Sequence, residues 1–530
     1  MDRPADLSPY RFTNLPIYQS TNLPMLLGLD IGTTTIKAAA YDPDAGRVAA
    51  IAGRPTPTDH PAAGRSEHDP EALWDAAAAC LREVTAAVGD RPIVGLAIAS
   101  LAEAGVMLDA AGRPLAPIIA WYDRRSEPQA EWLERQLSEA ELHAITGQRA
   151  GASFGVCKWL WMREHWPDAA AQMATWLPVP NYILFRLTAE RSIDFSQASR
   201  MLAFDQRRLD WSERILDAVG LRREQLPRPL PGGTVIGAVT GEAAAATGLP
   251  AGMPCALGGH DHLCAAFAAG AYRPGVVADS SGTAQAVLTV VPGFASTPKM
   301  AAAGYACYAH VLPGQYILKA GLKAAGGAVE WLARQLAGPD AAPDRLPYDA
   351  LLARAGRGVG VRAGPLWLPH LLDSGTPEGD RRSRAALVGV RLEHDAGDIF
   401  RGLLESLAFW LRHNLEDVRD LPIWRPVEEV ILLGGTTRLV LLSQLKADIL
   451  GRPVIVPELP EAAAIGAALL AGLAAGVFRT PAEAVGSLRY GRTVIEPDAS
   501  RVAWYDRLYR EAYLPLYAAL REVNHRLAEF

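Results

Sequence analysis

A strand–turn–strand pattern that occurs twice constrains the fold of this chain more than any other feature. Residues 25–42 contain two apolar strands joined by the turn Gly32-Thr33, with Asp30 just before the turn. The same order returns at residues 275–290 around Gly282-Thr283. Two apolar runs separated by a glycine-containing turn are typical of a β-hairpin. The repetition predicts two domains of similar plan, each beginning with such a hairpin.

Helical and strand patterns alternate between and after the two hairpins. Apolar residues recur at helical spacing over residues 70–88, 399–418 and 439–450, and short strand-like runs occupy residues 93–99 and 430–433. This alternation favours α/β domains. The chain has 530 residues, 50% of them hydrophobic, which is enough for two large domains with substantial cores.

Composition and charge exclude several classes of protein. Lys and Arg total 52 against 58 Asp and Glu, a net charge of −6 without a like-charge block, so a nucleic-acid partner is not expected. The five cysteines are scattered and form no CxxC pair, which predicts neither disulfides nor a zinc site and favours a reducing, cytoplasmic setting. The small-apolar run at residues 462–478 is too short to cross a membrane, so a buried helix is expected there. The N-terminus lacks the basic and apolar regions of a secretory signal.

The first 24 residues differ from the rest of the chain. They repeat the sequence Thr-Asn-Leu-Pro at residues 13–16 and 21–24 and show no helical or strand period. We therefore expect residues 1–24 to be a non-core N-terminal tail, with the first domain starting at Met25.

The two Gly-Thr turns point to phosphate chemistry. Glycine lets the backbone approach a phosphate closely, while free N–H groups and the hydroxyls of Thr33, Thr34 and Thr283 can donate hydrogen bonds to its oxygens. Asp30, beside the first turn, can hold Mg²⁺ directly or through water. One such turn alone would be interpreted as an ordinary tight turn, but two at corresponding positions favour phosphate binding. The chain contains no Gly-Lys dipeptide, which excludes a P-loop, and no strand followed by G-x-G-x-x-G.

Asp261 stands in the segment Gly258-Gly259-His260-Asp261-His262, between a run of small residues and a helical stretch. At such a strand end a carboxylate can accept the proton of a hydroxyl as a general base. An Asp that only caps the next helix is an alternative of equal weight. A metal site at His260 and His262 is not expected, because no third ligand lies nearby in the sequence.

A further glycine turn, Gly434-Gly435-Thr436, follows the apolar run at residues 431–433 and precedes the predicted helix at 439–450. Such a turn lets a flat ring or a phosphate lie against the backbone. The strand–turn–helix order therefore adds a second candidate element for nucleotide binding.

The order of these motifs resembles that of the FGGY family of carbohydrate kinases. In chain order, the motifs that carry the resemblance are Asp30-Ile31-Gly32-Thr33-Thr34, residues 64–74, residues 121–125, residues 194–199, Gly259-His260-Asp261, Ser281-Gly282-Thr283, Gly434-Gly435-Thr436 and Glu461-Ala462-Ala463. Each motif is short, but their order and spacing together are specific. The resemblance covers the chain from Met25 to about Phe478.

The resemblance implies an α/β fold of the actin-like ATPase (ribonuclease-H-like) type, with two domains around a central cleft that closes by a hinge. It places a sugar-binding domain at residues 25–270 and an ATP-binding domain with C-terminal helices at residues 271–530. The implied activity is ATP- and Mg²⁺-dependent phosphorylation of a hydroxyl of a neutral sugar or polyol, xylulose or a related ketose or polyol. The small-molecule acceptor is the expected partner, with no nucleic acid and no membrane, and a homodimer is left open.

The resemblance also implies roles for individual residues. Asp261 falls on the position of the catalytic base and Asp30 on that of the Mg²⁺-associated aspartate. The phosphate and nucleotide positions are Thr33, Thr34, Gly282, Thr283, Gly326, Gly434, Gly435 and Thr436, and the substrate positions are Glu103, Trp121, Asp123, Asp261 and His262.

Glu103 departs from the patterns of two family subgroups. Xylulose kinases place a histidine at this strand end and glycerol kinases an Arg-Glu pair, whereas this chain has Ala102-Glu103. An ionised carboxylate can accept hydrogen bonds from two adjacent hydroxyls and repels a substrate carboxylate, so we expect neutral acceptors to be good substrates and sugar acids poor ones. In the alternative, Glu103 pairs with Arg124 or Arg125 and does not meet the substrate. Thr436 replaces the family's third glycine and is expected to crowd the nucleotide without preventing its binding.

Two other functions fit the sequence less well. An actin-like ATPase whose ATP cycle drives conformational change would share the fold, but it would not need Asp261 after two glycines or the segment at residues 121–125. A sugar-responsive repressor would need a helix-turn-helix module and a basic patch, and residues 1–24 provide neither. Sugar-dependent release of ADP would separate the three functions.

Overall fold

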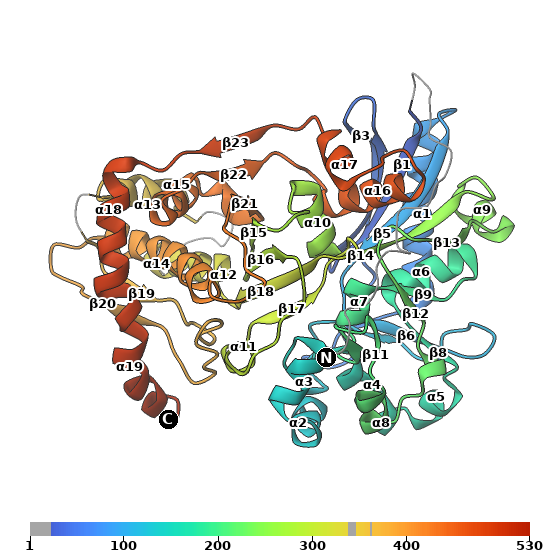
Figure 1. Ribbon diagram of the computed structural model, residues 1–530, viewed down its shortest axis with the longest axis horizontal. Helices are drawn as coiled ribbons and strands as arrows, with labels where there is room; N and C mark the ends of the chain where they lie inside the picture. Colours follow the sequence, from blue (N-terminus) through green and yellow to red (C-terminus); the bar gives the residue numbers. More distant parts are fainter. Residues whose placement is uncertain (1–22, 338–345, 361–362) are drawn as a thin grey trace.

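Two large β-sheets, each with helices packed on it, organise the molecule (Figure 1). The structure is a computed structural model and describes residues 23–337, 346–360 and 363–530. Residues 1–22, which make up most of the predicted N-terminal tail, lie outside the described residues.

The first sheet has six strands in the order β13-β14-β5-β1-β2-β3. Their bounds are β1 (Met25–Ile31), β2 (Thr35–Asp42), β3 (Arg47–Pro55), β5 (Ile93–Ser100), β13 (Val235–Ala238) and β14 (Pro254–His260). Strands β1 and β2 pair antiparallel, and β1 and β5 pair parallel. The first predicted hairpin is therefore confirmed.

The second sheet has seven strands in the order β17-β18-β16-β15-β21-β22-β23. Their bounds are β15 (Val276–Ser281), β16 (Gln285–Val291), β17 (Ala306–Ala309), β18 (Tyr316–Leu322), β21 (Glu429–Leu433), β22 (Val454–Pro457) and β23 (Arg492–Ile495). Strand β15 pairs antiparallel with β16 and parallel with β21, as β1 does with β2 and β5. The second hairpin is thus confirmed, and the shared pairing pattern supports the predicted internal duplication.

Helices pack on the outside of both halves. On the first sheet these are α1 (Pro70–Val88), α6 (Val179–Thr188) and α9 (Gly241–Thr247), and on the second half α12 (Gly326–Ala337), α13 (Tyr348–Gly356), α14 (Ala396–Asp417) and α15 (Val440–Leu450). The predicted start of α1 is confirmed, because Asp69 Oδ1 accepts a hydrogen bond of 2.8 Å from the N–H of Glu71. The helices predicted at residues 70–88, 399–418 and 439–450 correspond to α1, α14 and α15.

Two helices of small residues lie between the sheets (Figure 1): α10 (Asp261–Ala269) and α16 (Ala462–Ala474). Helix α16 comes from the C-terminal half but packs on β1, β5 and β14 of the first sheet. The contact is close enough that a Cβ at Gly28 would lie 1.8 Å from the carbonyl oxygen of Ala464. The buried helix expected at residues 462–478 is confirmed, and none of the described helices combines the length and apolarity needed to span a membrane.

Shorter elements complete both halves. In the first half these are α2 (Glu127–Gln136), α3 (Glu139–Thr146), α4 (Gly155–His165), α5 (Pro167–Gln172), α7 (Phe195–Ser199), α8 (Glu213–Val219), β4 (Glu67–His68), β6 (Gly105–Leu108), β7 (Ile118–Ile119), β8 (Thr175–Pro178), β9 (Ser192–Asp194), β10 (Phe204–Asp205), β11 (Asp210–Trp211) and β12 (Arg228–Leu230). In the second half they are α11 (Pro298–Ala303), β19 (Leu366–Leu368), β20 (Ala386–Val388) and α17 (Pro481–Gly486).

The C-terminal helices α18 (Ala499–Leu508) and α19 (Leu514–Leu527) run along the second half and support a loop near the cleft. Tyr517 donates a hydrogen bond of 3.0 Å to Asp380 Oδ2, and His525 Nε2 lies 2.6 Å from the same oxygen. Asp380 also lines a cavity to which both halves contribute. The end of the chain therefore holds one wall of the cavity in place.

Candidate active site

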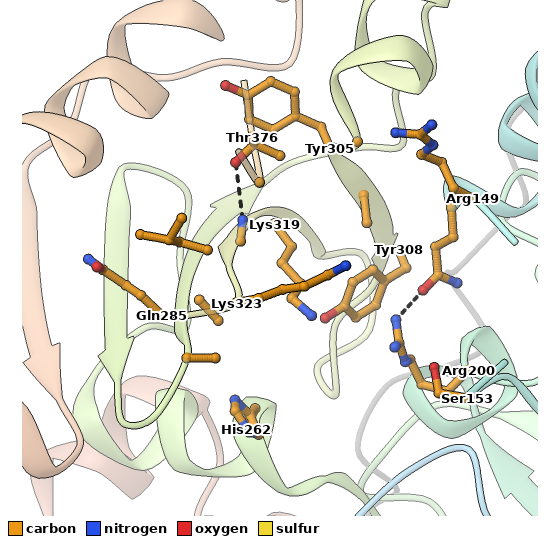
Figure 2. Close-up of a pocket in the computed structure, with 18 of the residues that line it drawn as sticks. Arg149, Ser153, Arg200, His262, Gln285, Tyr305, Tyr308, Lys319, Lys323 and Thr376 are labelled. Atoms are coloured by element: carbon orange, nitrogen blue, oxygen red, sulfur yellow. Dashed lines mark hydrogen bonds between the residues drawn. The ribbon is translucent and has the colours of Figure 1, made fainter. Parts of the chain in front are cut away.

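A cavity of about 580 Å³ is lined by both halves of the chain (Figure 2). The first half contributes the turn after β1, the end of β5 and the start of α10, and the second half contributes β16, β17, β18 and the loop that contains Asp380. Of the residues predicted to act on a substrate or phosphate, Thr33, Glu103, Trp121, Asp261 and His262 line this cavity. The cavity therefore brings together residues that lie far apart in the sequence.

Asp261 is the first residue of α10 and follows directly after β14. Its Oδ1 accepts a hydrogen bond of 2.6 Å from the N–H of His262 and lies 3.2 Å from His260 Nε2. The Oδ2 atom has no hydrogen-bond partner among the described residues. Asp261 therefore touches the helix start, as a capping residue would, and also presents a carboxylate oxygen to the cavity.

Burial shifts the pKa values of Asp261 and His262 in this turn. Desolvation, together with the nearby charge of Glu103, raises the pKa of Asp261 to about 7, while the hydrogen bond from His262 opposes the shift. Desolvation and the charge of Lys319 lower the pKa of His262 to about 4. At neutral pH both states of Asp261 are populated and His262 is uncharged. This carboxyl can exchange a proton near physiological pH.

Asp30 is the penultimate residue of β1 and meets an excess of negative charge. Its Oδ1 is buried without a hydrogen-bond partner. Burial, followed by the charges of Asp261 and Glu461, raises the pKa of Asp30 well above its usual range, and Lys37 opposes the shift. Lys37 pairs with Glu461 at 2.8 Å. An unsatisfied carboxylate oxygen surrounded by other acids fits a divalent cation.

Mg²⁺ often binds through one or two carboxylates, with water and substrate phosphates as its other ligands. The described part of the chain contains no group of three or more His, Cys, Asp or Glu side chains that could hold a metal. Asp30 therefore fits a Mg²⁺ ion that is held mainly by water and phosphate oxygens rather than by a protein cage.

Glu103 lies at the cavity wall, and Arg200 occupies one oxygen of its carboxylate. Arg200 Nε donates a hydrogen bond of 2.7 Å to Glu103 Oε1, and Arg200 Nη2 contacts the same oxygen. Both side chains are largely buried. The alternative pairing of Glu103 with Arg124 or Arg125 is wrong, because these arginines pair with Glu127 and with Asp123 and Glu67. The predicted contact of Glu103 with the hydroxyls of an acceptor stays a prediction.

The backbone at Glu103 is also unusual. Its φ of 67° lies in the left-handed region, which is uncommon for a residue other than glycine. The buried Lys158 donates a hydrogen bond of 3.2 Å to the Glu103 carbonyl. Desolvation lowers the pKa of Lys158 to about 7, against the opposing charges of Glu103 and Asp123. Lys158 thus helps to hold the strained turn that carries Glu103.

Trp121 and Asp123 belong to one loop but lie in different environments. Trp121 lines the cavity, and its Nε1 donates a hydrogen bond of 2.8 Å to Thr33 Oγ1. Asp123 does not line the cavity, because Arg125 and the N–H of Ser66, at 2.7 Å, occupy its carboxylate. Asp123 therefore holds the loop that carries Trp121.

The predicted nucleotide residues of the second half gather where β15 and β21 end and α12 begins. The N–H of Gly326 donates a hydrogen bond of 2.9 Å to the Gly282 carbonyl, and a Cβ at Gly326 would lie 2.3 Å from that oxygen. Gly434 has a φ of 89°, and a Cβ there would lie 2.4 Å from the Ser281 carbonyl oxygen. Only glycine fits both positions without displacing the backbone.

Two threonines and a glycine complete this group. Thr436 donates a hydrogen bond of 3.1 Å from Oγ1 to the Ser281 carbonyl, so its side chain is directed to the protein. The Thr283 carbonyl accepts a hydrogen bond of 3.1 Å from the N–H of Gly327. A Cβ at Gly435 would meet no atom within 4 Å, so its backbone faces open space. In the first hairpin, the Thr34 carbonyl accepts a hydrogen bond of 3.0 Å from the N–H of Thr56.

Several cavity residues were not predicted from the sequence. Arg200 follows directly after the motif at residues 194–199, so a longer motif would have included it. Gln148 accepts a hydrogen bond from Arg200, and Lys319 and Tyr308 lie on β18 and β17. These last three residues stand in no recognisable motif, and only the tertiary packing of the chain brings them to the cavity.

Comparison with known proteins assigns both halves of the chain. The model of the FGGY family of carbohydrate kinases, N-terminal domain, matches residues 25–268, and that of the C-terminal domain of the same family matches residues 278–475. Xylulose kinase from Escherichia coli (strain K12) is 30% identical over 502 residues, which cover 94% of this chain and 99% of that protein. Glycerol kinase from Citrifermentans bemidjiense is 31% identical over 472 residues, 86% of this chain and 91% of that protein. The crystal structure of xylulose kinase from Rhodospirillum rubrum superposes with a TM-score of 0.86 at 32% identity, covering 94% of this chain and 100% of that chain.

Proposed function

Because this chain belongs to the FGGY family of carbohydrate kinases, we propose that it transfers the γ-phosphoryl group of ATP to a hydroxyl of a sugar or polyol, with Asp261 as the general base. The family membership makes the chain a carbohydrate kinase and confirms the expected α/β fold of the actin-like ATPase type. Xylulose and related ketoses and polyols are the first acceptors to test, because the relatives include a xylulose kinase and a glycerol kinase.

The position of Asp261 is the observation that carries this proposal. Its carboxylate lines the cavity and has a pKa of about 7, so the ionised form is available to accept a proton at neutral pH. As the acceptor hydroxyl gives its proton to Asp261, its oxygen forms a bond to the γ-phosphorus. The bond between that phosphorus and the β–γ bridging oxygen breaks, and ADP leaves with the bonding electron pair.

Asp30 is the proposed residue for a Mg²⁺ ion bound with ATP. A bound Mg²⁺ neutralises charge on the phosphates as the leaving group develops. The buried, unpartnered Oδ1 of Asp30 and the acids around it support this assignment. Lys37 and Glu461 balance one another beside Asp30 and limit the excess of negative charge.

The remaining residues are assigned either to the nucleotide and its phosphates or to the acceptor. We assign Thr33 and Thr34 to the phosphates from the first hairpin, and Gly282, Thr283, Gly326, Gly434, Gly435 and Thr436 to the nucleotide. Glu103, Trp121 and His262 are assigned to the acceptor because they line the cavity with Asp261. Asp123 is assigned to positioning the Trp121 loop, since its carboxylate is occupied.

The domain assignment is part of the same proposal. Residues 25–270 form the acceptor-binding part and residues 271–530 the nucleotide-binding part. Helix α16 is the exception to this division, because it packs on the first sheet although it belongs to the second segment. A helix shared in this way couples the two parts mechanically when the cleft closes around its substrates.

An ATPase that uses ATP only to change conformation is the alternative function. A cavity that combines Asp261 with the paired Glu103 and Arg200 suits a small polar acceptor better than a conformational cycle without one. Release of ADP from ATP and Mg²⁺ with each of a panel of pentoses, ketoses and polyols tests the difference. Acceptor-dependent ADP release supports the kinase, and ADP release at the same rate without any acceptor contradicts it.

A further inference from the structure

Lys319 on β18 is a cation in the cavity wall without a partner. Its side chain forms no hydrogen bond or ion pair within the described residues. Across β18 it faces Leu288 on β16 and Ala306 on β17, which are both apolar. Desolvation, followed by the charge of Arg200, lowers the pKa of Lys319 to about 8 against the opposing charge of Glu103, so the ammonium form still predominates at pH 7. The cavity therefore contains an ammonium group that pairs directly with no carboxylate of the described residues.

The other cations that line the cavity are paired. The ion pairs are Arg200 with Glu103, Lys323 with Asp373 at 2.5 Å, Arg149 with Glu139 at 3.0 Å, and Arg381 with Glu134 at 3.6 Å. Asp380, a further acid of the lining, is held by Tyr517 and His525. After these pairs are formed, Lys319, Asp261 and, through Oε2, Glu103 are among the charged groups of the described lining that still present an unpaired polar atom.

Further hydrogen-bond donors without partners lie in the cavity lining. The Oη of Tyr308 and the Nε of Arg149 are buried and make no hydrogen bond among the described residues. Tyr308 lies two residues from Ala306, the strand neighbour of Lys319, so the two side chains share one face of the sheet. Figure 2 shows Lys319 and Tyr308 projecting into the same part of the cavity. These side chains offer donors and a positive charge, and Asp261 contributes its carboxylate to the same cavity.

A desolvated ammonium without a counter-charge is costly, and a ligand that supplies the counter-charge recovers that cost on binding. Hydroxyl groups can accept a hydrogen bond from Lys319 but leave its charge unbalanced. A carboxylate accepts hydrogen bonds from Lys319 and Tyr308 and neutralises the charge as well. Arg200 balances the charge of Glu103 through Oε1, so the carboxylate of Glu103 repels such a group less than an unpaired carboxylate would.

We propose that the acceptor carries an acidic group, the carboxylate of a sugar acid, which Lys319 binds while a hydroxyl of the same molecule lies at Asp261. This inference rests on the proposed kinase function and names the class of its acceptor. Lys319 is then the residue that determines specificity for acidic over neutral acceptors.

Two pairs of acceptors that differ only at one terminal carbon test the proposal: xylonate with xylitol, and gluconate with glucitol. Their binding is measured by calorimetry without nucleotide, and their phosphorylation by ADP release with ATP and Mg²⁺. Both assays compare the native chain with Lys319→Met and with the control Lys323→Met, which removes a lysine of the same cavity that is already paired with Asp373. Melting temperatures show whether each variant is folded.

We expect the native chain to bind at least one acid about tenfold more tightly than its polyol. Lys319→Met should abolish this preference, and Lys323→Met should retain it. A native chain that prefers both polyols, or a Lys319→Met variant that keeps the acid preference, overturns the proposal. An increased KM for ATP in Lys319→Met with an unchanged acceptor preference also overturns it, because Lys319 would then serve the nucleotide phosphates. Acid-selective binding without ADP release from any acceptor would support the charge inference and contradict the proposed kinase activity.

Discussion

Replacing Asp261 by Asn should lower activity and raise stability at the same time. Asn keeps the shape of the side chain and the hydrogen-bond acceptor for the N–H of His262, but it cannot take a proton. We expect turnover to fall by about 10² or more, in line with the contribution of a general base, with little change in the binding of ATP. In the native chain, kcat/KM for the acceptor at limiting ATP should rise with pH through about 7, where Asp261 ionises.

The stability effect follows from the raised pKa. The pKa of Asp261 rises from 3.8 in its ordinary state to about 7 in the folded chain, so ionisation increasingly weakens the folded state as pH rises from about 4 to about 7. At 1.36 kcal/mol per pKa unit, ionisation of Asp261 can lower the free energy of unfolding by at most about 4 kcal/mol. The side chain is 23% exposed, and solvent screening reduces our expected value to about 2 kcal/mol. The variant, which cannot ionise, should therefore melt a few degrees above the native chain at pH 8, with a smaller difference at pH 5.

Steady-state kinetics and thermal melts at pH 5 and 8 measure both effects. Asp69→Asn is the matched control, because Asp69 also lies at a helix start and Asn keeps its capping hydrogen bond. An Asp261→Asn variant that retains most of its activity would show that Asp261 only caps α10. An equal difference in melting temperature at both pH values would show that the carboxylate is already ionised at pH 5.

Three other substitutions or deletions test separate parts of the structure. A chain that begins at Met25 should melt and turn over like the full chain, because the preceding tail has no core pattern. Gly326→Ala should raise the KM for ATP about tenfold, since the new Cβ would lie 2.3 Å from the Gly282 carbonyl oxygen and must displace the turn. Glu103→Gln leaves Arg200 buried without its counter-charge and should cost about 3–5 kcal/mol of stability, with a higher KM for the acceptor and an unchanged KM for ATP.

Each of these predictions has a control variant or a result that would contradict it. Gly356→Ala places a Cβ in open space and should leave the KM for ATP unchanged. If it raises the KM for ATP as much as Gly326→Ala does, the clash with the Gly282 carbonyl is not the cause. Glu127→Gln breaks an exposed pair with Arg124 and should cost under about 1 kcal/mol. If Glu103→Gln and Glu127→Gln lower the free energy of unfolding equally, the pair of Glu103 and Arg200 stabilises the fold no more than a surface ion pair does. A large fall in melting temperature on deletion of residues 1–24 would assign a structural role to the tail.

Features encoded by neighbouring residues were predictable from the sequence. The hairpins at residues 25–42 and 275–290 and the helix α1 are set by local apolar period, turn glycines and a capping Asp, so no distant contact is needed to recognise them. The small residues of α16 likewise indicate a helix packed closely on all sides, and the structure buries it between the sheets. The position of Asp261 at a strand end followed from the glycines before it and the helical stretch after it.

The electrostatics of the cavity were decided by tertiary structure alone. Glu103 meets Arg200, 97 residues further along the chain, rather than the arginines of the nearer loop at residues 121–125. The residues next to Lys319 in the sequence give no sign of its role. Neighbouring strands place apolar residues beside it, and its ammonium group lies in the cavity. Local sequence specifies the period and the ends of helices and strands, but the partner of a charged side chain depends on strand register and on the packing of segments far apart in the chain.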